Sequence, residues 1–196
     1  MIKPKFTTFT GVDDFTDLDR LVEISDKYPV EWGILSGFYN KQRCPNEETI
    51  QKVLSKGLKL AYHLCEKSAE QFQEGTFAIP DEFSRIQVNG KPDLEKLVKL
   101  NVKQEMIIQV DKFSKVDVSQ LYDVSAGRGL VPESFPEHPG YMVGFAGGIN
   151  PENVEEYLKN INCDADYWID MESGVRTDNK LDLNKVEAVL QKVYGY

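Results

Sequence analysis

The feature that most constrains the fold is a regular alternation of short apolar segments with amphipathic helical segments along the 196 residues. The apolar segments recur about every 25 residues, which is typical of repeated βα units. The predicted strands are Lys5–Thr10, Val30–Ser36, Leu58–Leu64, Arg85–Val88, Glu105–Val110, Gln120–Val124, Tyr141–Phe145 and Tyr167–Met171. The clearest predicted helices are Asp14–Lys27, Glu47–Ser55, Asp93–Leu100, Pro151–Asn160 and Leu183–Val193. The chain is therefore predicted to adopt a parallel α/β fold.

Two architectures of this class fit the alternation. Eight strands suit a small single-domain (β/α)8 TIM barrel over residues 1–196, and an open doubly wound sheet also alternates strand and helix. The open fold carries its glycine fingerprint after the first strand, where residues 10–14 show no such pattern. Glycine-rich loops instead follow the last two predicted strands, which is where barrels hold phosphate. We therefore predict the barrel, with weaker helical patterns after the third, fifth and sixth strands.

Composition excludes several classes of function. The chain has 23 basic and 32 acidic residues, and a net charge of −9 argues against binding nucleic acid or an anionic membrane. The longest apolar runs are strand-sized, and the first residues lack the pattern of a signal peptide. Cys44, Cys65 and Cys163 are odd in number and far apart, so they suggest neither a disulfide framework nor a metal site. We expect a cytoplasmic protein without metal or cofactor, and the sequence does not indicate its oligomeric state.

The two late loops predict an anion site. Gly147 and Gly148 follow the seventh strand, and Ser173 and Gly174 follow the eighth. Glycines let backbone N–H groups approach a ligand closely, and Asn150 begins a helix whose dipole favours negative charge. The predicted ligand class is a phosphorylated small molecule.

Strand parity predicts which side chains surround that ligand. The less apolar residues of each strand are expected to face the barrel axis, because the other set must pack against helices. The residues predicted to form one polar pocket at the C-terminal rim are Thr7, His63, Asn89, Gln109, Asp123 and Asp170. The alternative is that some of them only satisfy one another in a polar barrel interior.

Several of these segments resemble phosphoribosylanthranilate isomerase, a small (β/α)8 enzyme of tryptophan biosynthesis. Residues 146–154 (AGGINPENV) are close to the family's AGGLNPENV, and residues 170–175 (DMESGV) resemble its DVSSGV. Residues 121–124 (LYDV) are similar to its LLDS, and residues 86–90 (IQVNG) to its VQLHG, with Asn89 in the histidine position. The resemblance covers most of the chain and is most specific in the C-terminal half.

The resemblance implies an Amadori rearrangement of a phosphorylated aminoaldose. A general acid opens the ribose ring and a general base removes the C2′ proton. The family's acid corresponds to Asp123. Its base is a cysteine in a first-strand K-x-C-G-x-T motif, and aligning the last position with Thr10 places Thr7 at the cysteine. A threonine hydroxyl is far too weakly acidic to serve as a resting anionic base.

Two further residues enter the hypotheses. His63 has a pKa range suited to a replacement base, although a hydrogen-bonded structural histidine fits the same pattern. Arg43 follows the second strand, where the family has an arginine that pairs with the anthranilate carboxylate, and a solvated loop arginine is the alternative. We therefore consider an isomerase with a displaced base, a diverged sugar-phosphate enzyme using Asp123 and His63, and a non-catalytic phosphosugar-binding barrel.

Overall fold

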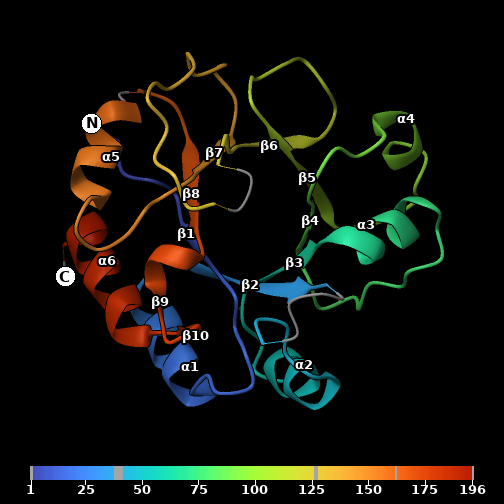
Figure 1. Ribbon diagram of the computed structural model, residues 1–196, viewed down its shortest axis with the longest axis horizontal. Helices are drawn as coiled ribbons and strands as arrows, with labels where there is room; N and C mark the ends of the chain where they lie inside the picture. Colours follow the sequence, from blue (N-terminus) through green and yellow to red (C-terminus); the bar gives the residue numbers. More distant parts are fainter. Residues whose placement is uncertain (1, 38–41, 126–127, 162, 196) are drawn as a thin grey trace.

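The computed structural model describes residues 2–37, 42–125, 128–161 and 163–195. Eight parallel strands form a closed barrel in chain order, and β8 pairs with β1 (Figure 1). The strands are β1 Thr7–Thr10, β2 Val30–Ser36, β3 Leu60–Leu64, β4 Arg85–Val88, β5 Glu105–Val110, β6 Ser119–Tyr122, β7 Val143–Ala146 and β8 Tyr167–Met171. The helices are α1 Leu18–Lys27, α2 Glu47–Leu54, α3 Glu66–Gln73, α4 Leu94–Leu97, α5 Val154–Ile161 and α6 Leu183–Tyr194. The predicted barrel is confirmed.

Most differences from the predicted bounds lie at element ends. Helix α1 begins at Leu18 rather than four residues earlier, because the Asp17 carboxylate accepts hydrogen bonds from the first-turn backbone N–H groups. Before α5, the Asn150 side-chain oxygen accepts from the N–H groups of Glu152 and Asn153, so a turn precedes the helix. A short hairpin, β9 Arg176–Thr177 and β10 Lys180–Leu181, follows the 3-10 turn η1 Ser173–Val175 and was not predicted.

Aromatic side chains cover the barrel where helices are missing. In the part of the chain that the structure describes, the connections after β5 and β6 contain no helix. Phe113 lies 5.7 Å from Phe145 in edge-to-face geometry, and Phe135 lies 5.0 Å from Tyr157 of α5. Such pairs add to the apolar area that they bury. These loops therefore close the outer core beside β6 and β7 with aromatic rings.

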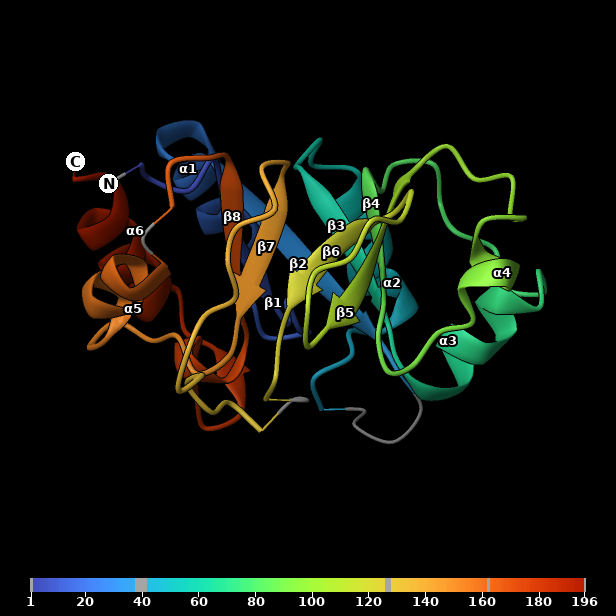
Figure 2. The ribbon, with the colours of Figure 1, turned by 90° about the horizontal axis from the view of Figure 1, so that it is seen from above.

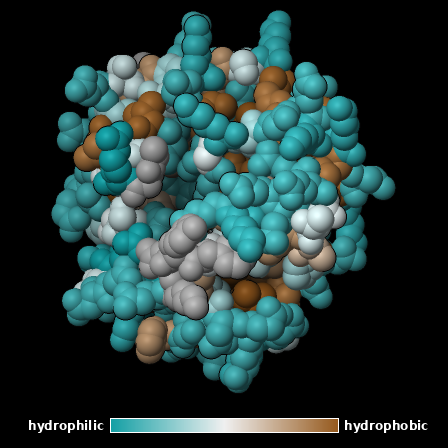
Figure 3. Space-filling view, turned by 45° about the vertical axis from the view of Figure 1, so that its right-hand side comes forward, coloured by the Kyte–Doolittle hydropathy of each residue, from teal (hydrophilic) through white to brown (hydrophobic). Residues whose placement is uncertain are grey.

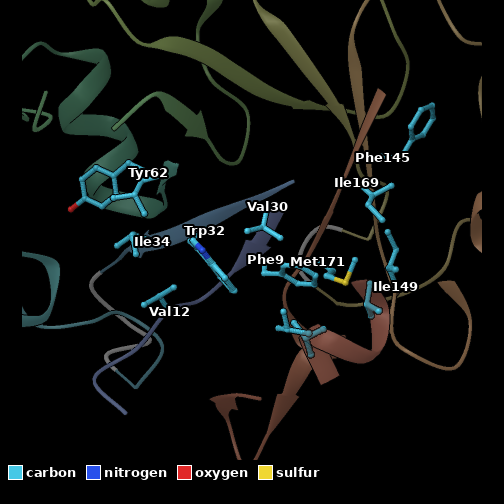
Figure 4. Packing of buried hydrophobic residues seen from close by; sticks show 14 of the residues in the cluster. Phe9, Val12, Val30, Trp32, Ile34, Tyr62, Phe145, Ile149, Ile169 and Met171 are labelled. Atoms are coloured by element: carbon cyan, nitrogen blue, oxygen red, sulfur yellow. The ribbon is translucent and has the colours of Figure 1, made fainter. Parts of the chain in front are cut away.

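The main hydrophobic core lies between the strands and the outer helices. Figure 4 shows part of it, including Phe9 and Trp32, whose ring centroids are 5.8 Å apart. Near the N-terminal ends of the strands, the barrel interior holds Trp168. A Cβ on Gly144 would stand 2.3 Å from the Trp168 ring, so position 144 requires glycine. Arg85 also contacts the Trp168 ring and forms a buried ion pair with Glu31. The interior at the N-terminal ends of the strands is thus filled, which leaves the C-terminal ends for a ligand.

The loops that follow the strands gather at one end of the barrel, toward which the arrowheads of β5 and β7 point in Figure 2. In barrels of this type that end carries the ligand site. The face of the molecule in Figure 3 is mostly hydrophilic, with scattered apolar residues. No helix in the described residues is both long and apolar enough to cross a membrane.

Candidate active site

The C-terminal ends of the strands surround a cavity of about 680 Å³. Five of the six residues predicted to form a polar pocket line it, and these are His63, Asn89, Gln109, Asp123 and Asp170. The prediction that polar side chains from many strands converge at this rim is therefore largely confirmed. The sixth residue, Thr7, lies elsewhere.

Thr7 faces out of the barrel rather than into it. Its hydroxyl lies 3.1 Å from the Tyr194 hydroxyl of α6. Phe9 must face the helices because it is the large apolar residue of this strand, and Thr7 has the same parity. The prediction that Thr7 faces the pocket is therefore wrong. Thr10 lines the cavity instead, and it is followed by Gly11, as the cysteine of the K-x-C-G-x-T motif is followed by glycine.

Thr10 forms a buried hydrogen-bonded group with Asp170 and His63. Its hydroxyl donates to Asp170 Oδ1 at 2.9 Å, and His63 Nε2 lies 3.5 Å from the Thr10 hydroxyl oxygen. Gly33 of β2 makes room, because a Cβ there would stand 2.5 Å from the Thr10 hydroxyl. Strand parity read from Phe9 would have identified Thr10, whereas the role of Gly33 is visible only in three dimensions.

Burial changes the proton affinity of both titratable members. Burial and the nearby Arg85 lower the pKa of His63 to about 3, so its imidazole is neutral and a weak base. Burial raises the pKa of Asp170 to about 8, and the Thr10 hydrogen bond opposes this rise. His63 is thus poorly suited to the base role considered from the sequence.

Asp123 lies on the β6 side of the same cavity and is half-buried. Its Oδ1 accepts the Ser125 N–H at 2.8 Å, and its Oδ2 accepts from Gln109 Nε2 at 3.3 Å. A Cβ on Gly147 would stand 3.4 Å from Asp123 Oδ1, so the carboxylate adjoins the first glycine loop. The carboxyl group is therefore oriented at the edge of the predicted phosphate site.

The two glycine loops pack against each other at the β7–β8 end. Gly147 and Gly148 have φ angles of 108° and 66°, which favour glycine. A Cβ on Gly174 would stand 1.9 Å from the Ile149 carbonyl oxygen. Gly147, Gly148 and Ser173 line the cavity, and Gly174 allows the loops to touch. Since the lining residues described here include no Lys or Arg at this end, an anion there would depend on backbone N–H groups.

Arg43 is not among the described residues that line the cavity. Its Nη1 donates to Glu172 Oε1 at 2.8 Å, and its Nε donates to Asn179 Oδ1 at 2.7 Å. A ligand carboxylate would have to displace Glu172, so the predicted role of Arg43 is not supported by this arrangement. Residues 38–41 of the predicted loop lie outside the described residues.

A buried ion pair that was missed in the sequence connects both ends of the chain at this rim. Arg176 Nη2 donates to Asp13 Oδ2 at 2.9 Å, and its Nη1 donates to the Gly11 carbonyl oxygen at 2.8 Å. The Leu181 N–H also donates to Asp13 Oδ2. These bonds fix the turn after β1 against the β9–β10 hairpin, and so hold Thr10 beside β8. Their separation of more than 160 residues hides them from sequence patterns.

The cysteines do not supply an anionic base. Burial raises the pKa of Cys65 to about 11, although Asn89 Nδ2 lies 3.0 Å from its sulfur, and burial also raises the pKa of Cys44. Within the described residues, no group of three or more His, Cys, Asp or Glu side chains is arranged to hold a metal ion. Proton transfer in this cavity would therefore rest on carboxyl groups.

Comparison with known proteins identifies the family. The sequence model of the N-(5′-phosphoribosyl)anthranilate (PRA) isomerase family matches residues 81–192, which is more than half of the chain. The chain belongs to the phosphoribosylanthranilate isomerase family. Asp123 and both glycine loops fall inside the matched range, and Thr10, Arg43 and His63 fall outside it.

Individual relatives agree with this assignment. The chain is 32% identical to N-(5′-phosphoribosyl)anthranilate isomerase of Streptococcus gordonii over 119 residues, covering 55% of this chain and 58% of the relative. It is 26% identical to the Bacillus cereus protein of the same name over 165 residues, covering 74% and 78%. The chain thus spans little more than half the length of the first relative.

Solved structures of this family share the fold. The phosphoribosylanthranilate isomerase of Thermotoga maritima is 15% identical, with a TM-score of 0.68 and full coverage of both chains. Another isomerase structure with the same TM-score holds reduced 1-(o-carboxyphenylamino)-1-deoxyribulose 5-phosphate. The likeness of fold therefore also includes the described residues before 81, which the family sequence model does not match.

Proposed function

We propose that this protein isomerises a phosphorylated N-ribosylamine to the corresponding 1-amino-ketose, as the family name implies for N-(5′-phosphoribosyl)anthranilate. The observation that carries the proposal is the position of Asp123. Its carboxyl group adjoins Gly147, so a possible proton donor and the glycine loop proposed to hold phosphate share one cavity. A sugar whose 5′-phosphate rests on the glycine loops would present its ring oxygen near the middle of the cavity.

Asp123 is proposed as the general acid. In its protonated form it would donate a proton to the ribose ring oxygen as the C1′–O bond breaks. Gln109 and the Ser125 N–H hold its two oxygens in place, which favours one orientation. The backbone around Gly147, Gly148, Ser173 and Gly174 would hold the phosphate, and Asp170 would face the sugar.

The proposed setting is tryptophan biosynthesis in the cytoplasm. One matched relative is a multifunctional tryptophan biosynthesis protein from Phycomyces blakesleeanus, 31% identical over 78 residues. The cysteines are unpaired in the structure, which is consistent with a reducing compartment. We propose a small phosphorylated sugar as the ligand, with no nucleic-acid or membrane partner.

The experiment is complementation of a tryptophan auxotroph that lacks the isomerase, joined to a direct assay with N-(5′-phosphoribosyl)anthranilate. Growth that depends on the intact gene, together with turnover by the purified protein, is the expected result. Growth lost with Asp123→Asn would link the activity to this cavity. If neither growth nor turnover is found, the isomerase proposal is wrong.

A non-catalytic phosphosugar-binding role is the second candidate. It is favoured by the ion pair between Arg43 and Glu172, and by a threonine where the family motif has cysteine. This role predicts thermal stabilisation by ribose 5-phosphate without any turnover. Measuring both quantities on one preparation separates the two candidates.

A further inference from the structure

One buried hydrogen bond joins the first and last strands of the barrel at the cavity. The Thr10 hydroxyl of β1 donates to Asp170 Oδ1 of β8 at 2.9 Å, and both residues line the cavity that Asp123 enters from β6. Asp170 is 5% exposed, and no Lys, Arg or N-terminal partner within ion-pair distance of it is found in the described residues. Burying an ionised carboxyl group without a cation is costly, and groups perturbed in this way cluster at functional sites.

The other nearby groups are poor bases. The Thr10 hydroxyl is too weakly acidic, the Cys65 thiol has a pKa raised to about 11, and the His63 imidazole has one lowered to about 3. Glu172 also lines the cavity, but it is held in the ion pair with Arg43. Glu66 and Glu70 also line the cavity, but they belong to α3 outside the barrel. Among the described lining residues, Asp170 is therefore the carboxyl group carried by a barrel strand.

The surroundings of Asp170 suit a proton acceptor. Thr10 contacts it from β1, and the charges of Glu31 from β2, Asp123 from β6 and Glu172 after β8 act on it. His63 of β3 adjoins Thr10 and is neutral. Burial and these three carboxylates raise the pKa of Asp170 to about 8, against the Thr10 hydrogen bond. A base that titrates near the working pH is the most effective kind.

We propose that Asp170, positioned by the Thr10 hydroxyl, is the general base that removes the C2′ proton, in place of the family's thiol. This role rests on the proposed isomerase function. After Asp123 protonates the ring oxygen and the C1′–O bond breaks, the substrate is an iminium ion. Asp170 takes the C2′ proton, and the C–H electron pair forms the C1′=C2′ bond while the iminium electrons return to nitrogen. Tautomerisation of the resulting enol gives the ketose, so atoms balance without an oxidant or reductant.

Thr10 is a positioning residue in this scheme. Its hydrogen bond stabilises the ionised carboxylate, so removing the hydroxyl should raise the pKa of Asp170 further. A structural role for Thr10 alone would not move the pH dependence of turnover. Thr7 provides a matched control, because it lies on the same strand but its hydroxyl contacts Tyr194 outside the barrel.

The experiment compares the wild type with Asp170→Asn, Thr10→Val and Thr7→Val, using N-(5′-phosphoribosyl)anthranilate across pH 6 to 10. We expect wild-type kcat to rise with pH through a midpoint near pH 8, where half of Asp170 is ionised. Thr10→Val should shift this rise to higher pH with little change in KM, and Thr7→Val should leave it in place. Asp170→Asn should lose about 10³-fold in kcat while ribose 5-phosphate still stabilises it thermally.

Two results overturn the base role alone. These are an Asp170→Asn variant whose kcat stays within tenfold of an active wild type, and a Thr10→Val profile that coincides with that of Thr7→Val. If Asp170→Asn does not fold, the pH profiles of Thr10→Val and Thr7→Val still test the base role of Asp170. A wild type that binds ribose 5-phosphate but never turns over the substrate overturns the isomerase function, and the base role with it.

Discussion

The two ends of the cavity are built differently. At the β7–β8 end, backbone geometry forms the site, with glycines at 147, 148 and 174 and Asp123 beside them. At the β1–β3 end, side chains form it, with Thr10 and His63 meeting over Gly33. The family sequence model matches the first region and not the second.

This difference indicates which part of the chemistry can vary. A phosphate held by backbone N–H groups needs close approach of two loops, and only glycine allows it at such distances. A proton acceptor needs only a group of suitable pKa within reach of C2′, and more than one side chain can satisfy that. If the roles proposed for the two ends are right, the β7–β8 end should be restricted in sequence, whereas the β1–β3 end can be rebuilt.

The largest expected effect is at Asp123. Asp123→Asn keeps the size of the side chain but cannot donate an acidic proton, so kcat should fall about 10³-fold with little change in stability. Steady-state kinetics at saturating substrate measure this. Asp117→Asn, at an exposed site in the loop before β6, is the matched control and should leave kcat unchanged. Equal kinetics for the two variants would contradict the acid assignment.

The next largest effect is at Gly174. In Gly174→Ala the new Cβ would meet the Ile149 carbonyl oxygen, and separating the loops should cost about 3 kcal/mol of unfolding free energy. Urea denaturation measures this cost. We also expect ribose 5-phosphate to lose its stabilising effect on the variant, which thermal melts can follow. An unchanged melt with undiminished phosphate response would show that the loops do not need their present contact.

At the other end, His63 should make stability depend on pH. Its pKa is about 3 in the folded protein against 6.5 in the reference state, so the unfolded chain binds the extra proton between these values. Stability should therefore fall as pH falls below about 6.5, by about 1 kcal/mol per pH unit relative to a His63→Gln variant. Urea denaturation of both proteins between pH 4 and 7 measures the difference. A difference that does not change with pH would show that His63 is not buried in neutral form.

The smallest effect is expected at Arg43. Arg43→Met removes a half-exposed ion pair with Glu172, which should cost no more than about 1 kcal/mol of stability. Because this guanidinium is already paired, the KM for N-(5′-phosphoribosyl)anthranilate should change less than threefold or so. An increase in KM of about 100-fold would instead show that Arg43 leaves Glu172 to bind the substrate carboxylate. That result would make the β1–β3 end of the cavity more like the family than its sequence indicates.

Much of the fold followed from local patterns. Four strands, including Val30–Ser36 and Tyr167–Met171, have the predicted bounds because apolar alternation and turn residues delimit them clearly. The start of α1 was missed because the Asp17 cap competes with earlier acidic residues. Thr7 was misplaced because a motif alignment was preferred to the parity of Phe9. The cavity-lining positions on or just after β3 to β8 were anticipated because strand parity there was clear.

The sequence by itself determined the barrel, the two glycine loops after β7 and β8, and the position of Asp123, because these depend on periodicity and on residues adjacent in the chain. Only the tertiary structure showed that Thr10 donates a hydrogen bond to Asp170, that Arg176 binds the turn after β1, and that Glu172 forms an ion pair with Arg43. Closing the barrel brings β1 beside β8. Contacts across that closure, and the desolvation that changes the pKa of Asp170 and His63, depend on distances in space that no local pattern records.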